Sequence, residues 1–164
     1  MPSNWPPRSD DEGRRPLPPL LGELKELGIA EVFARLGDEG YPELRPGHGC
    51  VFRHMDRDGM RLTELAERGG LTKQAVGEVV DDLEQLGYVE RVPDPADRRA
   101  KIIRLTEHGI EAGRAALRIF DDVERRWAAT VGEERVAALR ETVEALCAAE
   151  RDAAAAGRSP AAAA

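Results

Sequence analysis

The chain has 164 residues, a formal net charge of −7 and 41% hydrophobic residues, of which few are aromatic. This length suits one globular domain with an aliphatic core. No apolar run approaches the ~18–20 residues of a membrane span, and the N-terminus lacks the apolar segment of a signal peptide. We therefore expect a soluble, cytoplasmic protein without membrane contact. Its two cysteines stand far apart and do not form a disulfide framework.

Both ends of the chain have a biased composition. Residues 1–19 hold six of the eleven prolines, and such a stretch buries too little apolar area to offset the entropy lost on ordering. Residues 151–164 are mostly alanine, interrupted by Gly157 and Pro160, which stop helices. The composition predicts a disordered leader, a folded domain over residues 20–150 and a flexible tail.

The first periodic segment spans residues 20–37, where apolar residues recur every three to five positions and predict an amphipathic helix. A loop rich in glycine and proline leads to a short apolar segment, residues 50–55. There Cys50 and His54 have the i,i+4 spacing that a zinc site could use, and His48 lies just before them. Because no second ligand pair is nearby, we expect no metal and interpret Cys50 as a packing residue.

Residues 62–86 have the periodicity of two helices joined by a tight turn at Gly69-Gly70. Thr63 is expected to cap the first helix and Thr72 the second, because a hydroxyl oxygen can accept a hydrogen bond from a first-turn amide. Gly87 follows the second helix, and glycine commonly ends helices. The pair is predicted to be a helix-turn-helix.

Three positions predict how these two helices pack. Ala66 is small enough for a close crossing, Gly70 allows a turn conformation that a Cβ resists, and Val76 packs the second helix onto the first. Leu71 and Val79 are expected to complete the inward-facing set. One or two such positions occur by chance in any helical hairpin, so the prediction of a helix-turn-helix depends on the presence of the whole set.

Two short alternating segments follow, residues 88–92 and 101–105, and they predict a β-hairpin. The loop over residues 93–100 is longer than a tight turn requires and carries prolines, aspartates and arginines. Helix, turn, helix and hairpin together form a winged helix-turn-helix, here over residues 61–106. The predicted fold class is mainly α with a small β-hairpin wing (α+β).

The start of the second helix is the predicted reading surface, because in this architecture those turns enter the major groove of DNA. Gln74 can form two hydrogen bonds with an adenine edge. Thr72 and Lys73 can hold phosphate, and Gly77 lets the backbone come close. A solvated helix face is the plainer interpretation of each residue taken singly.

The wing loop presents Arg98 and Arg99, and a rigid loop carrying arginines suits insertion into a minor groove. Asp97 does not favour DNA itself, so we expect it to orient a neighbouring arginine. Lys101, at the start of the second strand, adds to the positive charge and is included among the predicted DNA contacts.

Charge is unevenly distributed over this region. Residues 91–104 contain five basic and two acidic side chains, whereas residues 62–106 contain seven basic and nine acidic ones. Asp81, Asp82 and Glu84 on the second helix would repel phosphate. DNA binding is therefore expected to depend on sequence and on two linked copies, with strong salt sensitivity.

Two long helices are predicted after the wing. Thr106 is expected to cap the first, Gly132 to break it, and Glu133 to begin a second that runs to about Arg151. The side chains expected along one side of the first are Ile110, Leu117, Phe120, Val123 and Trp127, and the second carries a heptad-like seam of Val136, Leu139, Val143 and Leu146. Such a seam requires a partner helix. We therefore expect a homodimer, with dimerisation helices at about residues 20–37 and 107–150 and two reading heads for a palindromic site.

The order of these elements resembles the MarR family of bacterial transcriptional regulators over roughly residues 20–149. The most specific motifs are the wing sequence Asp94-Pro95-x-Asp97-Arg98-Arg99 and the following Leu105-Thr106-x-x-Gly109. The resemblance implies an obligate homodimer that binds double-stranded DNA at a palindromic operator. It also implies a repressor that a small, often aromatic or phenolic ligand releases from the operator. Thr72, Lys73, Gln74 and Gly77 match the start of the family's recognition helix, and Arg98 and Arg99 match the wing tip.

The resemblance also implies a ligand pocket between the winged helix and the dimer helices. Phe33, His48, Phe52 and Phe120 lie on elements that line this pocket in the family, and each of them is equally well explained as core.

Two alternative functions stay open. One is a thiol-based redox-sensing regulator that uses Cys50 or Cys147, although neither cysteine has the basic neighbours that favour a reactive thiolate. The other is a winged-helix protein-interaction module without DNA contact, which the net negative charge favours. An enzyme is not expected, because the chain has no nucleophile elbow, P-loop, dinucleotide fingerprint or paired metal-ligand motif. No cofactor is implied.

Overall fold

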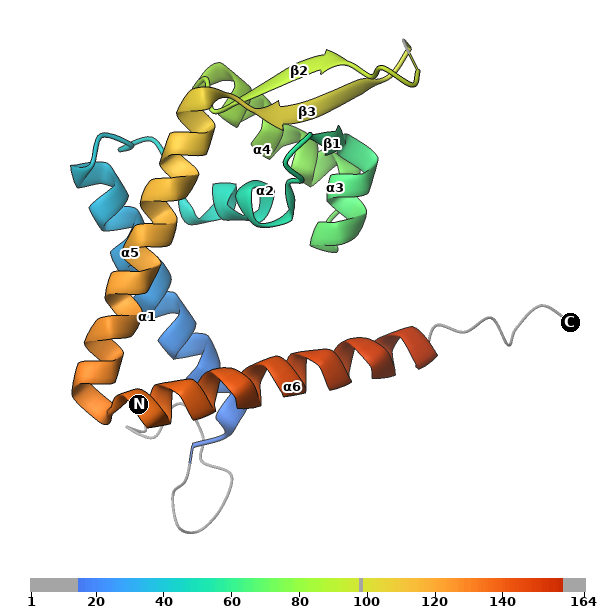
Figure 1. The fold of residues 1–164 in the computed structure, drawn as a ribbon. Coiled ribbons are helices and arrows are strands. Elements are labelled where there is room, and N and C mark those ends of the chain that lie inside the picture. The colour runs from blue at the N-terminus through green and yellow to red at the C-terminus, as the bar shows by residue number, and fades with distance from the viewer. Residues whose placement is uncertain (1–14, 98, 158–164) are drawn as a thin grey trace, which may run out of the picture. The chain divides into compact units, whose positions relative to one another are not determined.

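The structure is a computed structural model that describes residues 15–97 and 99–157. Mainly helical, with one small antiparallel sheet, it confirms the predicted fold class (Figure 1). The elements in chain order are α1 (Leu17–Asp38), the 3-10 helix η1 (Pro46–His48), α2 (Gly49–His54), β1 (Met60–Arg61), α3 (Leu62–Gly69), α4 (Lys73–Gln85), β2 (Val89–Pro93), β3 (Lys101–Leu105), α5 (Glu107–Val131) and α6 (Glu133–Gly157). The chain divides within α5 into two compact units, one ending at Phe120 and the other beginning at Asp121.

The sheet has three strands in the order β1-β3-β2, and both pairings are antiparallel. The β2–β3 hairpin forms the wing (Figure 1). β1 was not predicted, because a strand of two residues is too short for alternation to show. Gly59 precedes it with φ +84°, and a Cβ there would lie 2.5 Å from the carbonyl oxygen of Ile103. Glycine is therefore required where β1 begins to pair with β3.

α3 and α4 pack as the sequence predicted. Ala66 and Val76 are both buried, and Gly70 adopts a left-handed conformation (φ +62°) at the end of α3. The prediction for Leu71 is wrong, since this side chain is 45% exposed. It lies on the turn, against Gly69, and outside the crossing of the two helices. Val79 is only half-buried.

Two of the three predicted helix caps are confirmed. The Thr72 hydroxyl oxygen accepts a hydrogen bond from the Ala75 amide at 3.2 Å, and that of Thr106 accepts one from the Gly109 amide at 3.1 Å. The Thr63 cap is wrong. α3 begins at Leu62, directly after a strand whose pairing with β3 fixes the backbone of Arg61.

The Thr106-x-x-Gly109 motif attaches α5 to the turn between α4 and β2. The Thr106 hydroxyl donates to the Gly87 carbonyl at 2.6 Å, and its amide donates to the Tyr88 carbonyl at 3.1 Å. A Cβ at Gly109 would overlap the same Tyr88 oxygen. Only glycine lets the first turn of α5 approach this closely.

Both predicted chain ends need correction. α1 begins at Leu17, so predicted disorder is wrong for residues 17–19; Pro18 and Pro19 occupy the first helical turn, where a missing N–H costs nothing. The predicted flexible tail is also wrong in part, because α6 continues to Gly157 through a run of alanines with high helix propensity. Residues 1–14 and 158–164 lie outside the described part of the chain.

The long helices after the wing have the predicted boundaries. α5 ends at Val131, and Gly132 follows with φ +101°. Of the side chains predicted along one side of α5, Val123 is buried, whereas Leu117 and Phe120 are 66% and 39% exposed. The buried side chains of α5 before the division of the chain are Ala112, Ala115 and Ile119. None of the helices within residues 15–97 and 99–157 has the length and apolar character to cross a membrane.

Candidate nucleic-acid interface and ligand cavity

The first turns of α4 present an exposed polar face. Lys73 and Gln74 are exposed, and the Gln74 amide donates to the Glu78 carboxylate at 3.2 Å, a solvent-facing contact that a base edge can replace. The Thr72 oxygen is engaged as the cap, which leaves the hydroxyl proton free to donate to a phosphate. A Cβ at Gly77 would make only ordinary contact with Leu62 at 3.8 Å, so local packing does not require this glycine.

The acidic stretch of α4 is paired within the protein. Asp81 lies 2.5 Å from one terminal nitrogen of Arg91, and Glu84 forms an ion pair with the other. Partial burial lowers the pKa of Arg91, but the hydrogen bonds to the two carboxylates outweigh it and raise that pKa above its ordinary value. Asp82 is held separately by His48 at 2.9 Å. Each acid that the sequence placed against DNA binding therefore has an internal partner.

His48 is 4% exposed, and both of its ring nitrogens are engaged. Nδ1 accepts a hydrogen bond from the Arg45 amide at 3.2 Å, and Nε2 lies 2.9 Å from the Asp82 carboxylate. Because an amide can only donate, Nδ1 carries no proton and Nε2 donates to Asp82. His48 therefore ties η1 to α4. It does not line the cavity described below, contrary to the prediction, because its ring is directed to α4.

The base of the wing is held by Asp94, a buried carboxylate. It accepts hydrogen bonds from the Ala96 amide at 2.8 Å and from Arg61 Nε at 2.7 Å. These two contacts, the Ala96 amide first, lower the pKa of Asp94. Sequence reasoning missed Arg61, which is 33 positions away and joins Asp94 only because β1 pairs with β3.

Asp97 supports the wing loop through backbone contacts. Its carboxylate accepts a hydrogen bond from the Arg99 amide at 3.1 Å and lies 3.9 Å from the Arg61 guanidinium. It was predicted to orient an arginine. It contacts Arg99 through the backbone, and its guanidinium neighbour is Arg61.

Two described cations of the wing are available to a partner. Arg99 and Lys101 are exposed, and no ion pair of either side chain is found within residues 15–97 and 99–157. Arg104, by contrast, pairs with Glu90 at 2.7 Å, and Arg91 is engaged on α4. Arg98, the other predicted wing-tip contact, lies outside the described residues.

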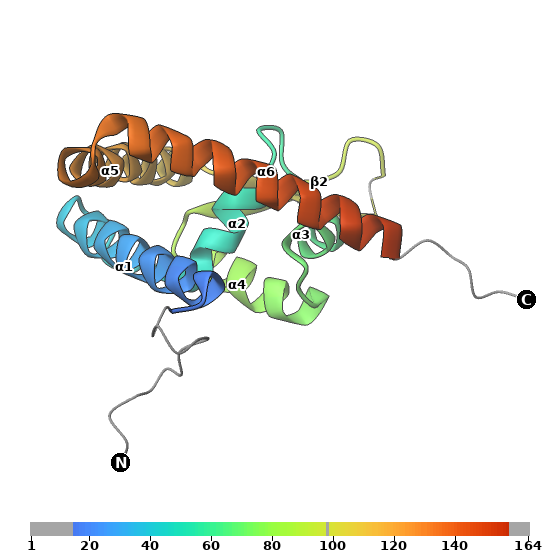
Figure 2. The same cartoon turned by 90° about the horizontal axis from the view of Figure 1, so that it is seen from below.

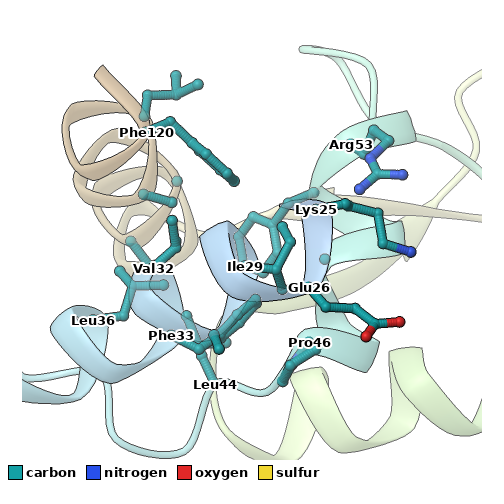
Figure 3. A pocket seen from close by; sticks show the side chains of 17 residues that line it. Lys25, Glu26, Ile29, Val32, Phe33, Leu36, Leu44, Pro46, Arg53 and Phe120 are labelled. Carbon is teal, nitrogen blue, oxygen red and sulfur yellow. The ribbon is translucent and has the colours of Figure 1, made fainter. Parts of the chain in front are cut away.

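A cavity of about 610 Å³ lies between α1, α2 and the first half of α5. Figures 1 and 2 show where these helices lie, and Figure 3 shows the side chains that line the cavity. This volume is in the range of small-molecule sites. Three of the four residues predicted for a pocket line it: Phe33, Phe52 and Phe120. The other apolar lining residues are Ile29, Ala30, Val32, Leu36, Leu44, Pro46, Gly49, Ala112, Gly113, Ala116 and Leu117.

Three charged side chains also line this cavity. Lys25 and Glu26 come from α1 and Arg53 from α2, and their polar ends lie on the same side of it in Figure 3. No ion pair of Lys25 or Arg53 is found among the residues that the structure describes. The cavity therefore combines an aromatic interior with a predominantly cationic rim, which suits an apolar ring bearing an anionic group.

The cysteines lack the setting of a reactive thiol. Cys50 is half-buried, its thiol donates to the Gly47 carbonyl at 3.2 Å, and burial raises its pKa. Cys147 is exposed on α6. Across the described ranges, no cluster of three or more histidine, cysteine or acidic side chains is arranged to hold a metal ion.

Comparison with known proteins identifies the family. The MarR family model matches residues 44–100. The chain is 32% identical over 96 residues to the transcriptional regulator HosA of Escherichia coli O111:H-, a match that covers 57% of this chain and 71% of HosA. The reduced form of MarR from E. coli has a similar fold, with a TM-score of 0.68, 18% identity, and coverage of 80% of this chain and 96% of MarR.

MepR from S. aureus shares the fold in two further structures, both 19% identical over 82% of this chain. A point mutant of MepR bound to an oligodeoxyribonucleotide has a TM-score of 0.56 and is covered over 97% of its length. MepR bound to ethidium bromide has a TM-score of 0.55 and is covered over 96%. Together with the winged helix and its Asp94-Pro95-x-Asp97 wing, the matches show that this chain belongs to the MarR family of transcriptional regulators.

Proposed function

We propose that the protein is a homodimeric, sequence-specific DNA-binding repressor that acts in the cytoplasm and leaves its operator when a small aromatic ligand binds. The observation that carries the proposal is that the winged helix presents two suitable surfaces next to each other. The exposed polar start of α4 can read bases, and the wing beside it presents the cations Arg99 and Lys101. This division between base contacts and phosphate contacts is typical of DNA-binding proteins.

The apolar seam of α6 supports the homodimer. Leu139 and Leu146 are exposed on this helix, although their heptad-like spacing is that of residues buried between helices. Leu27 on α1 is also exposed. A second copy of the chain would cover such side chains and would provide the second reading head that a palindromic operator requires.

The cavity supports the response to a ligand. MepR, which shares the fold, has been solved with ethidium bromide, a planar aromatic molecule. In this chain the phenylalanine-lined interior would hold an aromatic ring, and Lys25 and Arg53 would attract a carboxylate or phenolate on it. An aromatic acid is therefore the ligand class that fits best.

A route from the cavity to the reading surface runs through residues 44–49. Leu44, Pro46 and Gly49 line the cavity, and His48 from the same segment holds Asp82 on α4. A ligand that displaces this segment would move or break the His48–Asp82 hydrogen bond and shift α4. Release of DNA requires such a differential effect of the ligand on two arrangements of the protein.

Selection of bound sequences from random duplex DNA tests the DNA-binding function. We expect enrichment of an inverted repeat whose half-sites are about one helical turn apart. Enrichment of no sequence would contradict the proposal and favour the protein-interaction module.

Benzoate and benzylamine, a matched anionic and cationic pair, test the ligand class. We expect benzoate, and not benzylamine, to raise the melting temperature of the protein and to weaken binding to the selected DNA. The variant Arg53→Gln should reduce the effect of benzoate. Equal effects of the two compounds would contradict the proposed role of the cationic rim.

A further inference from the structure

The reading face of α4 continues into acidic residues. Lys73, Gly77 and Asp81 are each four residues apart, so they lie on one face of the helix, and Glu84 follows within one further turn. Asp81 and Glu84 remain 59% and 39% exposed at the side chain. Two unpaired carboxylates in this position would oppose the approach of a phosphate backbone.

Arg91 occupies the space between these two carboxylates. It comes from β2, its side chain is only 21% exposed, and each terminal nitrogen contacts a different acid: Nη2 lies 2.5 Å from Asp81, and Nη1 pairs with Glu84. A guanidinium is suited to such a contact, because its planar fork presents donors in fixed directions and it is always charged. A lysine would offer a single charged nitrogen in place of the two that contact these acids.

We propose that Arg91 is a positioning residue for DNA binding, which holds the carboxylates of Asp81 and Glu84 and offsets their charge so that α4 can approach phosphate. The inference rests on the proposed DNA-binding function. Arg91 differs from Arg99 and Lys101, whose exposed side chains are free to contact DNA directly. Its effect on affinity passes through the two acids.

Operator affinity of Arg91→Gln, measured by fluorescence anisotropy on the selected DNA at several salt concentrations, tests this role. We expect binding about tenfold weaker at low salt, and a smaller difference as salt screens the exposed carboxylates. In the triple variant Asp81→Asn/Glu84→Gln/Arg91→Gln, the acids are also neutral. We expect its affinity to return to within about twofold of the unaltered protein, since the repulsion is removed at its source.

The matched control has the same formal charge as that triple variant. It combines Arg91→Gln with Glu111→Gln and Glu141→Gln, two exposed acids of α5 and α6. Its affinity should remain as low as that of Arg91→Gln, which would show that the local pairing matters and not the net charge. Thermal melts of all variants check that they are folded, and Arg91→Met, which also removes the charge and keeps an unbranched side chain, replaces Arg91→Gln in every variant if the latter does not fold.

Three results would overturn the inference. Unchanged affinity of Arg91→Gln would show that the unpaired acids do not matter. A triple variant that binds as weakly as Arg91→Gln would show that Arg91 contacts phosphate itself. If the control variant regained as much affinity as the triple variant, the effect would depend on net charge and not on the local pairing. If the unaltered protein selects no DNA at all, the proposed function fails first and this inference fails with it.

Discussion

In the proposed DNA-binding surface, α4 and the wing differ in which of their charged side chains are paired. On α4 three acids are paired with other residues of the protein, Asp81 and Glu84 with Arg91 and Asp82 with His48. On the wing the internal bonds are made by the acids Asp94 and Asp97, and the cations Arg99 and Lys101 are left exposed. α4 thus has an exposed polar face beside paired acids, and the wing presents the exposed cations Arg99 and Lys101.

This difference explains how a chain of net charge −7 can bind an anionic polymer. The local field depends on which charges are free, and counting residues along the sequence does not show that. Three acids of α4 are offset by internal partners, so they contribute less to its local negative charge. On the wing, Arg91 and Arg104 are likewise paired with acids, so they contribute less positive charge. Each region then makes a separate, testable contribution to affinity or to sequence preference.

The largest expected effect comes from the wing cations. The double variant Arg99→Ala/Lys101→Ala should weaken operator binding roughly 100-fold at low salt, because the proposed dimer would lose four phosphate contacts. The slope of log affinity against log salt should fall by about one unit per lost contact, as titration at four or five salt concentrations would show. A control with Arg114→Ala/Arg135→Ala removes two exposed cations from α5 and α6. An equal loss of affinity in this control would show that net charge, and not the position of the wing cations, determines binding.

Gln74 tests the other half of the comparison. Gln74→Ala should cost about 1–3 kcal/mol of binding free energy and relax the preference at one base pair of each half-site. The salt slope should stay unchanged, because no phosphate contact is lost. Binding to a panel of single-base operator variants measures both quantities, and Gln85→Ala, at the far end of α4, is the matched control. A uniform loss over all operator variants would show that Gln74 does not read a base.

Loss of the contact between Arg61 and Asp94 at the base of the wing should have a smaller effect on affinity. In Arg61→Gln the contact with Asp94 is lost, and the loop over residues 94–100 should become less ordered, at a cost of about threefold in affinity from lost preorganisation. Hydrogen exchange of the Ala96 and Ala100 amides should become faster. Arg57→Gln, an exposed neighbour, should change neither amide. Protection equal to that of the unaltered protein would show that this contact is dispensable.

The smallest effect is a dependence on acid pH. The pKa of Asp94 is held below its ordinary value of 3.8 by the Ala96 amide and by Arg61, so its contribution to wing stability is present above that value. The contribution is lost as the pH falls through the lower pKa of the folded protein. NMR of the Ala96 amide should therefore show a transition below pH 3.8 that is absent in Asp94→Asn. A transition of the same size in both proteins would assign it to another group.

Local patterns in the sequence were sufficient for most elements of the fold. The helix-turn-helix, the Thr72 and Thr106 caps and the break at Gly132 depend on residues within one or two helical turns, and the structure confirms each of them. Errors arose where a neighbour distant in sequence decides the outcome. Thr63 does not cap α3 because the strand before it pairs with β3.

The site divides in the same way. The sequence by itself determined the exposed polar face at the start of α4 and the cationic character of the wing, since helical spacing and residue type define them. Only the tertiary structure decided which charges remain free, because Arg91, His48 and Arg61 reach their carboxylate partners across 10, 34 and 33 positions. An ion pair forms between groups that the fold brings within a few ångströms of each other. The number of positions between two residues in the sequence does not predict that distance.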